Sequence, residues 1–331
     1  MINLYPGFKN GRGNKTFFDI LELKTGLKVL PFTCGRSAMA VGLSAAGLGR
    51  TDEILVPPYI GQCVLSALSR TSFPTMTPSN RTKAILVFHQ FGFPQNLAII
   101  ESVARRNGWI ILNDCANTLF TKINEQFLVE WGDFTIISLS KLYPCGLGGG
   151  FYSKRLDIYE KVSANYEKLS YTHSIRAEQA LEKLVEINKG TYGPETIFEI
   201  NSLYGYLPDL VAFPQKAYFG LPSNLEDMGR DITHRKKMYK LALDVFGDNV
   251  PVCDDEVVPF AIPIFGEKER LFLIAEKIQN RFNVCAPVLH FDYARNMLEL
   301  DYRPSVVVGC HDGWTEEIVH QIFSMIKKEL R

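Results

Sequence analysis

The chain has 331 residues, of which 46% are hydrophobic and 22% are charged. This length can bury a large core, and the composition is typical of a soluble globular protein rather than a disordered one. The 36 basic residues balance the 36 acidic ones, so the formal net charge is zero. The charge therefore gives no electrostatic reason to expect nucleic acid or an anionic membrane as the main partner.

The seven cysteines show no C-x-x-C spacing, which favours reduced thiols over a disulfide or metal framework. The first residues, 1–7, do not combine a basic region with an apolar stretch, so a signal peptide is not predicted. No apolar run approaches the roughly 20 residues that span a bilayer. We therefore expect a cytoplasmic protein.

Short apolar runs alternate with helical patterns from about residue 27 to residue 152. The runs predict strands at 27–32, 53–56, 84–88, 109–113, 134–138 and 149–152, and the helical patterns predict helices at 37–48 and 95–107. Apolar strands separated by helices are typical of a mostly parallel sheet that is covered on both faces. In such sheets, ligands bind beyond the carboxyl ends of the strands.

The pattern changes near residue 231, after a more polar and helical region at 155–235. The later segments predict helices at 233–245, 268–282 and 315–330, and strands at 257–263 and 305–308. We therefore predict an α/β protein with a large domain over residues 1–230, including the N-terminal segment. A small α+β domain is expected over residues 231–331.

Two reactive side chains follow neighbouring predicted strands. Asp114 comes directly after the strand at 109–113, and Lys141 lies three residues after Ser138, which ends the strand at 134–138. An amine that can form an imine and an acid that can hold a pyridine nitrogen protonated are the groups that pyridoxal phosphate (PLP) requires. A surface lysine and a turn-forming aspartate are the structural alternatives. Asn117 is able to brace the carboxylate or the ring hydroxyl, or to form a turn.

The segment C-G-R-S at 34–37 leads into the predicted helix at 37–48. Free N–H groups at a helix start suit a phosphate, and the glycine lets a phosphate approach the backbone. Gly35, Arg36 and Ser37 are therefore candidate phosphate ligands, although Ser37 also suits an ordinary helix cap. Ser138 is a further candidate donor.

Two other segments near these strands are open to more than one interpretation. His89 follows the strand at 84–88, where it could contact the cofactor ring or have a structural role. The glycines at 146–150 precede a strand rather than a helix, so a dinucleotide fingerprint is not predicted. They instead indicate backbone packed close to the lysine. Cys34, Cys115 and Cys145 flank the site, where packing or a reactive thiol are both possible roles.

Taken together, these residues resemble the DegT/DnrJ/EryC1 family of PLP-dependent aminotransferases. The similarity rests on G-R-S-A at 35–38, D-E-I-L-V-P at 52–57, V-F-H-Q-F-G at 87–92, D-C-A-N at 114–117 and G-L-G-G at 146–149. The segment from 34 to 153 carries most of it. Three features differ from the family pattern: the compact S-x-x-K spacing, Gly61 where an aromatic ring is usual, and the absence of a G-Y-N segment.

The resemblance implies the aspartate-aminotransferase-like fold (fold type I) and a homodimer that holds PLP. Lys141 would form the imine with the cofactor, Asp114 would hold the ring nitrogen, and Tyr59 would take the place of the usual stacking ring. The implied reaction moves an amino group, expected from glutamate, to a keto sugar attached to a nucleotide.

Two other classes of function remain open. The first is a different PLP-dependent activity, such as a lyase or dehydratase, although sugar dehydratases of this family carry histidine in place of Lys141. The second is a non-catalytic protein on the same scaffold, which Gly61 and the missing G-Y-N segment favour. Arg230, Arg235 and Arg295 are each able to meet a nucleotide diphosphate, and the pattern does not distinguish between them.

Overall fold

The computed structural model describes residues 2–9, 16–189, 194–253 and 256–330. Its main sheet has seven strands in the order β1-β9-β8-β5-β4-β2-β3. In chain order these strands are β1 (Leu30–Phe32), β2 (Glu53–Leu55), β3 (Phe73–Thr75), β4 (Thr82–Phe88), β5 (Ile110–Cys115), β8 (Phe134–Ser138) and β9 (Gly149–Tyr152). The run from β8 to β3 is parallel throughout, whereas β9 is antiparallel to both of its neighbours.

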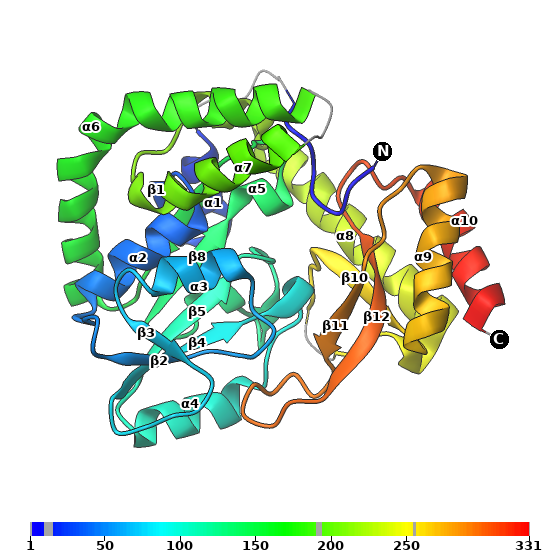
Figure 1. Cartoon of the computed structure of the whole chain (residues 1–331), viewed down its shortest axis with the longest axis horizontal. Coiled ribbons are helices and arrows are strands. Elements are labelled where there is room, and N and C mark those ends of the chain that lie inside the picture. The colour runs from blue at the N-terminus through cyan, green and yellow to red at the C-terminus, as the bar shows by residue number, and fades with distance from the viewer. Residues whose placement is uncertain (1, 10–15, 190–193, 254–255, 331) are drawn as a thin grey trace.

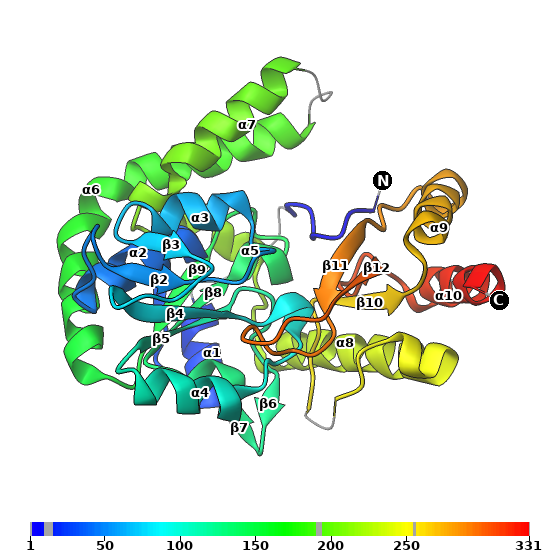
Figure 2. The ribbon, with the colours of Figure 1, turned by 60° about the horizontal axis from the view of Figure 1, so that its bottom comes forward.

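Helices cover both faces of this sheet (Figures 1 and 2). One face carries α2 (Gly35–Ala45), α3 (Gln62–Leu68) and the long α6 (Leu156–Lys189), and α2 packs on both β8 and β9. The other face carries α1 (Phe17–Thr25) and α4 (Leu97–Arg106). The mostly parallel sheet between helices confirms the predicted fold class.

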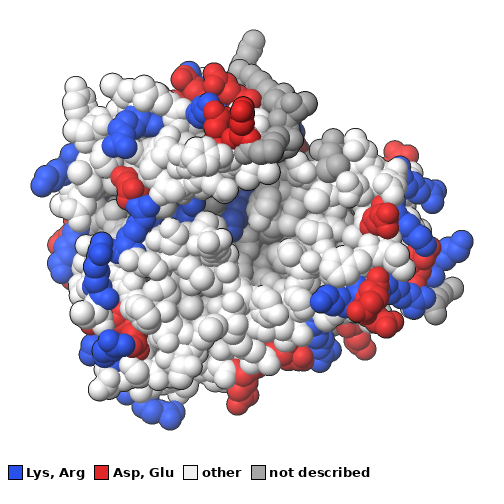
Figure 3. All heavy atoms as spheres, in the orientation of Figure 1, with Lys and Arg blue, Asp and Glu red and all other residues white. Residues whose placement is uncertain are grey.

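A second, smaller part of the molecule is built around an antiparallel sheet of three strands in the order β10-β12-β11. Its elements are α8 (Leu225–Phe246), β10 (Ala261–Phe265), α9 (Lys268–Phe282), β11 (Val288–Asp292), β12 (Tyr302–Gly309) and α10 (Glu316–Leu330). The surface is hollowed between the two parts on the face shown in Figure 3. Helix α8 runs through the predicted domain boundary at 230/231, and Ile2 pairs with Val284 of the small part.

Short elements complete the chain. They are the hairpin β6 (Lys122–Ile123) and β7 (Gln126–Phe127), the one-turn helix α5 (Leu139–Leu142), helix α7 (Pro194–Tyr206), and the 3-10 helices η1 (Gln90–Gly92), η2 (Leu128–Glu130), η3 (Leu207–Asp209), η4 (Gln215–Gly220) and η5 (Gly247–Asn249). Among the described residues, no helix is both long and apolar enough to cross a bilayer.

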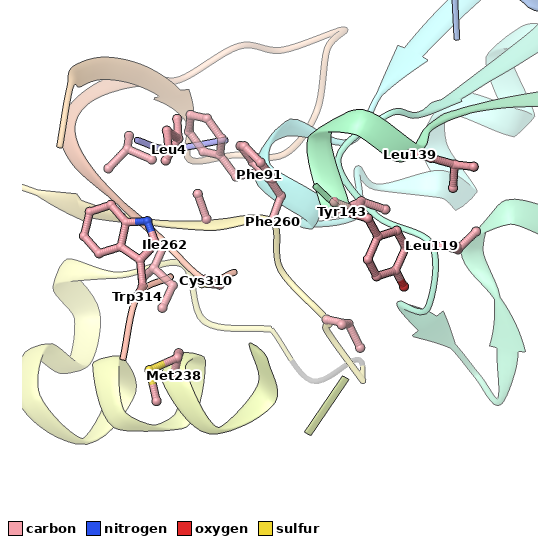
Figure 4. Close-up of a cluster of buried hydrophobic side chains, with 14 of the residues drawn as sticks. Leu4, Phe91, Leu119, Leu139, Tyr143, Met238, Phe260, Ile262, Cys310 and Trp314 are labelled. Carbon is pink, nitrogen blue, oxygen red and sulfur yellow. The ribbon is translucent and has the colours of Figure 1, made fainter. Parts of the chain in front are cut away.

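One hydrophobic core connects the two parts (Figure 4). Leu139 and Tyr143 of the large part belong to the same buried cluster as Phe260 and Trp314 of the small part. Burying apolar area is the main favourable term in folding, so a shared core stabilises the two parts together.

Strand β9 lies against the start of α2 at a distance that excludes a side chain. A Cβ atom built on Gly149 would lie 2.3 Å from the carbonyl carbon of Cys34 and 2.3 Å from the nitrogen of Gly35. At Gly150 it would lie 2.6 Å from Cγ1 of Val29. The glycine run therefore permits backbone to pack on backbone.

We expect Gly149→Ala to lower the free energy of unfolding by about 1–3 kcal/mol, because the backbone must move to accommodate the methyl group. Gly229→Ala is the matched control, since a Cβ there meets nothing within 4 Å and the residue lies inside α8. That change should stabilise the helix by about 0.5–1 kcal/mol. Urea unfolding of both variants measures the difference, and equal stabilities would contradict the proposed clash.

Candidate active site

Three of the predicted site residues, Asp114, Ser138 and Lys141, lie at the carboxyl ends of β5 and β8. Side chains alternate between the two faces of a strand, and Leu112 and Ile136 belong to the buried cluster on the α2 face. Asp114 and Ser138 lie two residues further along the same strands, so both point to the α2 side. Lys141 follows in the one-turn helix α5.

Asp114 is a buried carboxylate with one unused oxygen. It is 2% exposed, and its Oδ1 accepts a hydrogen bond of 2.9 Å from the N–H of Ala116. Burial raises the pKa of Asp114, and the positive charge of Lys141 opposes that change. Among the described residues, neither Oδ2 of Asp114 nor Nζ of Lys141 has a hydrogen-bond or ion-pair partner. The two groups are thus close enough to interact electrostatically while both remain available to a ligand.

The start of α2 offers unpaired donors near the same sheet edge. The backbone N–H groups of Gly35, Arg36 and Ser37 have no partner in the described part of the chain, and Cys34 provides no side-chain cap. These N–H groups and the helix dipole together favour an anion.

Two side chains at the start of α2 contact the C-terminal end of α7 and the residue that follows it. Arg36 Nη1 donates to the carbonyl oxygen of Tyr204 at 3.1 Å, and its guanidinium lies 5.0 Å from the centre of that ring. Ser37 Oγ donates to the carbonyl oxygen of Leu207 at 3.3 Å. The structure therefore leaves backbone donors free here while the two side chains tie α2 to the segment at 204–207.

The turn that carries Lys141 is held by the glycine run. The carbonyl oxygen of Gly148 accepts hydrogen bonds from Leu139 N at 2.9 Å and Ser140 N at 3.4 Å. Gly148 has a φ of 147°, a conformation that disfavours other residues. Ser138, at the N-terminal end of this turn, has no hydrogen-bond partner for its hydroxyl among the described residues. It remains a candidate donor to a phosphate.

Arg235, one of the three arginines considered for a nucleotide diphosphate, is buried and instead holds the other side of the same turn. Arg235 of α8 is 1% exposed, and its Nε lies 2.9 Å from Oδ1 of Asp231. Its Nη2 donates to the carbonyl oxygen of Leu142 at 2.7 Å, and its Nη1 donates to that of Pro259 at 3.3 Å. Arg235 therefore has a structural role and does not meet a substrate.

His89 lies on the opposite face of the sheet from Asp114, in a closed polar network. Its Nδ1 accepts the backbone N–H of Gln95 at 3.1 Å, so the neutral ring carries its proton on Nε2. Nε2 lies 2.6 Å from Oδ1 of Asn113. Burial lowers the pKa of His89 to about 4, and the ring is 0% exposed. This geometry favours the structural interpretation of His89 over contact with the cofactor.

Asn117 and Tyr59 both contact segments outside the immediate site. Oδ1 of Asn117 accepts the N–H of Phe91 at 3.3 Å, and Phe91 has a φ of 54°. Asn117 therefore supports the turn after β4 rather than bracing Asp114.

The ring of Tyr59 stacks on His290 with centroids 4.9 Å apart and meets Tyr302 edge-on at 4.5 Å. Tyr59 thus joins the large part to the small sheet, and it is 53% exposed.

The cysteines near the site are packing residues. Burial raises the pKa of Cys115 well above its usual value and also raises that of Cys145, so both thiols stay protonated. None of the seven cysteines, all of which lie in the described part of the chain, forms a disulfide. A reactive thiol is therefore not supported at either position.

The arrangement fits PLP by the chemistry of its groups. Asp114 offers an unused carboxylate oxygen to a protonated ring nitrogen, and Lys141 offers an unpaired amine. The start of α2 and the Ser138 hydroxyl offer donors to a phosphate. These are the three recognition elements that PLP needs, and they lie at one end of the parallel sheet.

His89 should make the stability of the fold depend on pH. Its pKa is about 4 in the folded state and 6.5 in an unperturbed ring. Between these values the unfolded chain binds more protons, so stability falls as the pH falls from about 6.5 to 4, by up to about 3 kcal/mol. In His89→Gln this contribution should be absent. Urea unfolding at several pH values tests this, and identical pH dependence in both proteins would contradict it.

Comparison with known proteins supports the resemblance to PLP-dependent aminotransferases. Residues 21–185 match a family model described as "Putative PLP-dependent aminotransferase". The L-glutamine:scyllo-inosose aminotransferase of Streptomyces griseus is 26% identical over 149 residues, which are 39% of this chain and 35% of that protein. A UDP-N-acetyl-3-dehydro-alpha-D-glucosamine 3-aminotransferase of Acidithiobacillus ferrooxidans is 28% identical over 136 residues, covering 35% and 37%.

The similarity in fold extends further than the similarity in sequence. A DegT DnrJ EryC1 StrS aminotransferase from Brucella abortus superimposes with a TM-score of 0.63 at 14% identity, covering 95% of this chain and 89% of that one. The matched sequence region, in contrast, spans about a third of the length of the two curated relatives. The family match, the order of the motifs and the shared fold together confirm the resemblance to the DegT/DnrJ/EryC1 family of PLP-dependent aminotransferases.

Proposed function

We propose that this protein is a PLP-dependent aminotransferase that transfers an amino group from an amino acid, expected to be glutamate, to a nucleotide-linked keto sugar. The observation that carries the proposal is the pair formed by Asp114 and Lys141. A buried carboxylate with a free oxygen and an unpaired amine interact at the ends of adjacent strands. Groups with this environment are typical of catalytic centres.

Each residue has a distinct task in this proposal. When bound, PLP would supply an electron sink for bond breaking at the carbon that carries the amino group. Asp114 Oδ2 would accept a hydrogen bond from the protonated ring nitrogen, and the positive charge of that nitrogen would favour the ionised form of the carboxyl group. Lys141 Nζ would hold the cofactor and later move a proton to or from the substrate carbon. The backbone N–H groups at the start of α2, with Ser138, would orient the phosphate.

The name of one relative supports the acceptor class: the Acidithiobacillus ferrooxidans protein is named for a UDP-linked dehydro sugar. The Streptomyces griseus protein is named for L-glutamine and scyllo-inosose, so it supports amino transfer to a keto group but names no nucleotide. The presence of Lys141 favours amino transfer over the dehydratase alternative. Asp114 is 2% exposed and its Oδ2 has no partner among the described residues, which disfavours a purely structural role because buried polar groups are normally satisfied.

A homodimer is part of the proposal. Helices α6 and α7 extend along one side of the molecule (Figure 2) and expose large apolar side chains. Tyr171 is 86% exposed and Phe198 is 74% exposed. A second copy of the chain would cover this surface, because removing apolar surface from water lowers the free energy of the assembly. Cysteines that are not joined in disulfides support a reducing compartment, and we propose the cytoplasm.

The cofactor site can be tested by labelling. After incubation with PLP and reduction with borohydride, peptide mass mapping should find a pyridoxyl group on Lys141. Lys141→Ala should lose this label, whereas Lys168→Ala, which removes an exposed lysine of α6, should keep it. A label distributed over surface lysines, with none at Lys141, would contradict the assignment.

The chemistry can be tested in the half-reaction with the amino donor. Glutamate should convert bound PLP to its amine form in the wild-type protein. Asp114→Asn should slow this conversion by about a hundredfold or more, because the ring nitrogen loses its anionic partner. Asp244→Asn, at an exposed site of α8, is the matched control and should leave the rate unchanged. Stopped-flow absorbance gives the rates, and no conversion with any amino acid would rule out amino transfer.

A further inference from the structure

A second cavity lies on the α4 face of the sheet, away from the candidate active site. We call it the α4 cavity; its volume is about 930 Å³, within the range of small-molecule sites. The start of α4, the β6–β7 hairpin and residues 294–295 of the small part form its walls, and Figure 2 shows the hairpin beside α4. Asp114, Ser138, Lys141 and the start of α2 do not line it.

Gln95 presents an unused donor to this cavity. The side chain is only 7% exposed, and its Oε1 accepts the backbone N–H of Met297 at 2.9 Å. This bond fixes the orientation of the amide, because only the oxygen can accept. Nε2 of Gln95 has no hydrogen-bond partner among the described residues, although the residue lines the cavity. Nε2 therefore has a hydrogen bond to give on the cavity side, which a ligand bound there can accept in place of water.

The start of α4 adds backbone donors beside Gln95. The helix has ten residues, and Asn96 provides no side-chain cap. The N–H groups of Leu97 and Ala98, which both line the cavity, have no partner in the described structure. The positive end of the helix dipole therefore lies at the cavity wall.

Among the described residues that line the cavity, the charge without an opposite partner is the positive charge of Arg295. Arg295 is half-buried, and Nη1 donates to Sγ of Cys253 at 2.9 Å. No carboxylate of the described residues lies within 4.0 Å of the Arg295 guanidinium. An anion near this guanidinium would gain a charge-assisted hydrogen bond.

The two acidic residues of the cavity wall already have partners. Glu101 lies 3.6 Å from Arg105, and it accepts the indole N–H of Trp131 at 3.3 Å. Glu130 accepts the N–H of Phe127 at 3.1 Å and lies 4.0 Å from Lys154. These carboxylates therefore do not neutralise Arg295.

We propose that the α4 cavity binds a small phosphate ester, with its phosphate at the start of α4. Gln95 Nε2, the two backbone N–H groups and Arg295 could donate to the three terminal oxygens of a phosphate, whose larger negative charge suits the guanidinium and the helix dipole better than a carboxylate does. The rings of Trp131 and Phe127 line the same cavity and suit the organic part of the ester. This site is separate from the proposed cofactor site and does not depend on the proposed function.

The full chain is saturated with PLP and then dialysed. Isothermal titration calorimetry then measures the binding of two probes, phenyl phosphate and inorganic phosphate. Phenyl phosphate should bind more tightly, because its ring contacts the aromatic wall. Gln95→Glu keeps the oxygen that accepts the Met297 N–H and places a negative charge where Nε2 was. This variant should weaken the binding of phenyl phosphate by about tenfold or more.

Gln279→Glu is the matched control, because it makes the same change at an exposed site of α9. Its affinity should equal that of the wild type, and circular dichroism should show that both variants fold. Three results would overturn the proposal: no binding of phenyl phosphate at millimolar concentration, equal affinity of Gln95→Glu and the wild type, or inorganic phosphate binding as tightly as the ester. Labelling of Lys141 is measured separately, so failure here is distinct from failure of the proposed function.

Discussion

The close contact between strand β9 and the start of α2 is the constraint on which the rest of the site depends. The backbone of Gly149 meets the backbone of Cys34 and Gly35 at a separation that no side chain permits. Because β9 is antiparallel, it returns the chain beside β8 and presents the Gly148 carbonyl oxygen to the turn of Lys141. One contact thus brings the helix donors, the lysine turn and the edge of the parallel strands into one region.

The end of β5 divides two different polar environments. Asn113 and Asp114 are neighbours in sequence, and strand geometry directs their side chains to opposite faces. Asn113 and His89 belong to one hydrogen-bond network, in which both ring nitrogens of His89 have a partner. Burial keeps this histidine neutral. Asp114 keeps an unused oxygen on the other face. A satisfied network behind a carboxylate fixes the strand without competing for its charge.

The sequence predicted elements well where the pattern was local and regular. The strand at 134–138 and the helix at 268–282 match β8 and α9, because apolar alternation or helical spacing is uninterrupted there. The strand expected at 257–263 instead forms over Ala261–Phe265. Phe260 N donates to Phe91 O of the large part, so the chain before β10 pairs with a distant segment. Strand β11 was not predicted, because its exposed and buried residues mix polar and apolar types.

The same distinction applies to the site. Asp114, Ser138 and Lys141 could be predicted because a parallel sheet gathers the ends of its strands. The role of Arg235 could not, because its acceptors are the carbonyl oxygens of Leu142 and Pro259, and main-chain acceptors leave no mark on the sequence. The sequence could not show whether His89 or Asn117 faces the cofactor. The face on which a side chain lies depends on strand register, and a single residue after a strand does not specify that register.

The buried guanidinium of Arg235 also makes the reactive lysine conditional on the completion of the chain. The turn of Lys141 is synthesised about ninety residues before α8 and more than a hundred before Pro259. Until those later segments arrive, the Leu142 carbonyl lacks the donor that holds it in the finished fold. A nascent or truncated chain that has its parallel sheet would therefore carry an amine in an unfixed turn. The protein acquires a positioned nucleophile only when α8 and the segment at Pro259 have folded against the turn of Lys141.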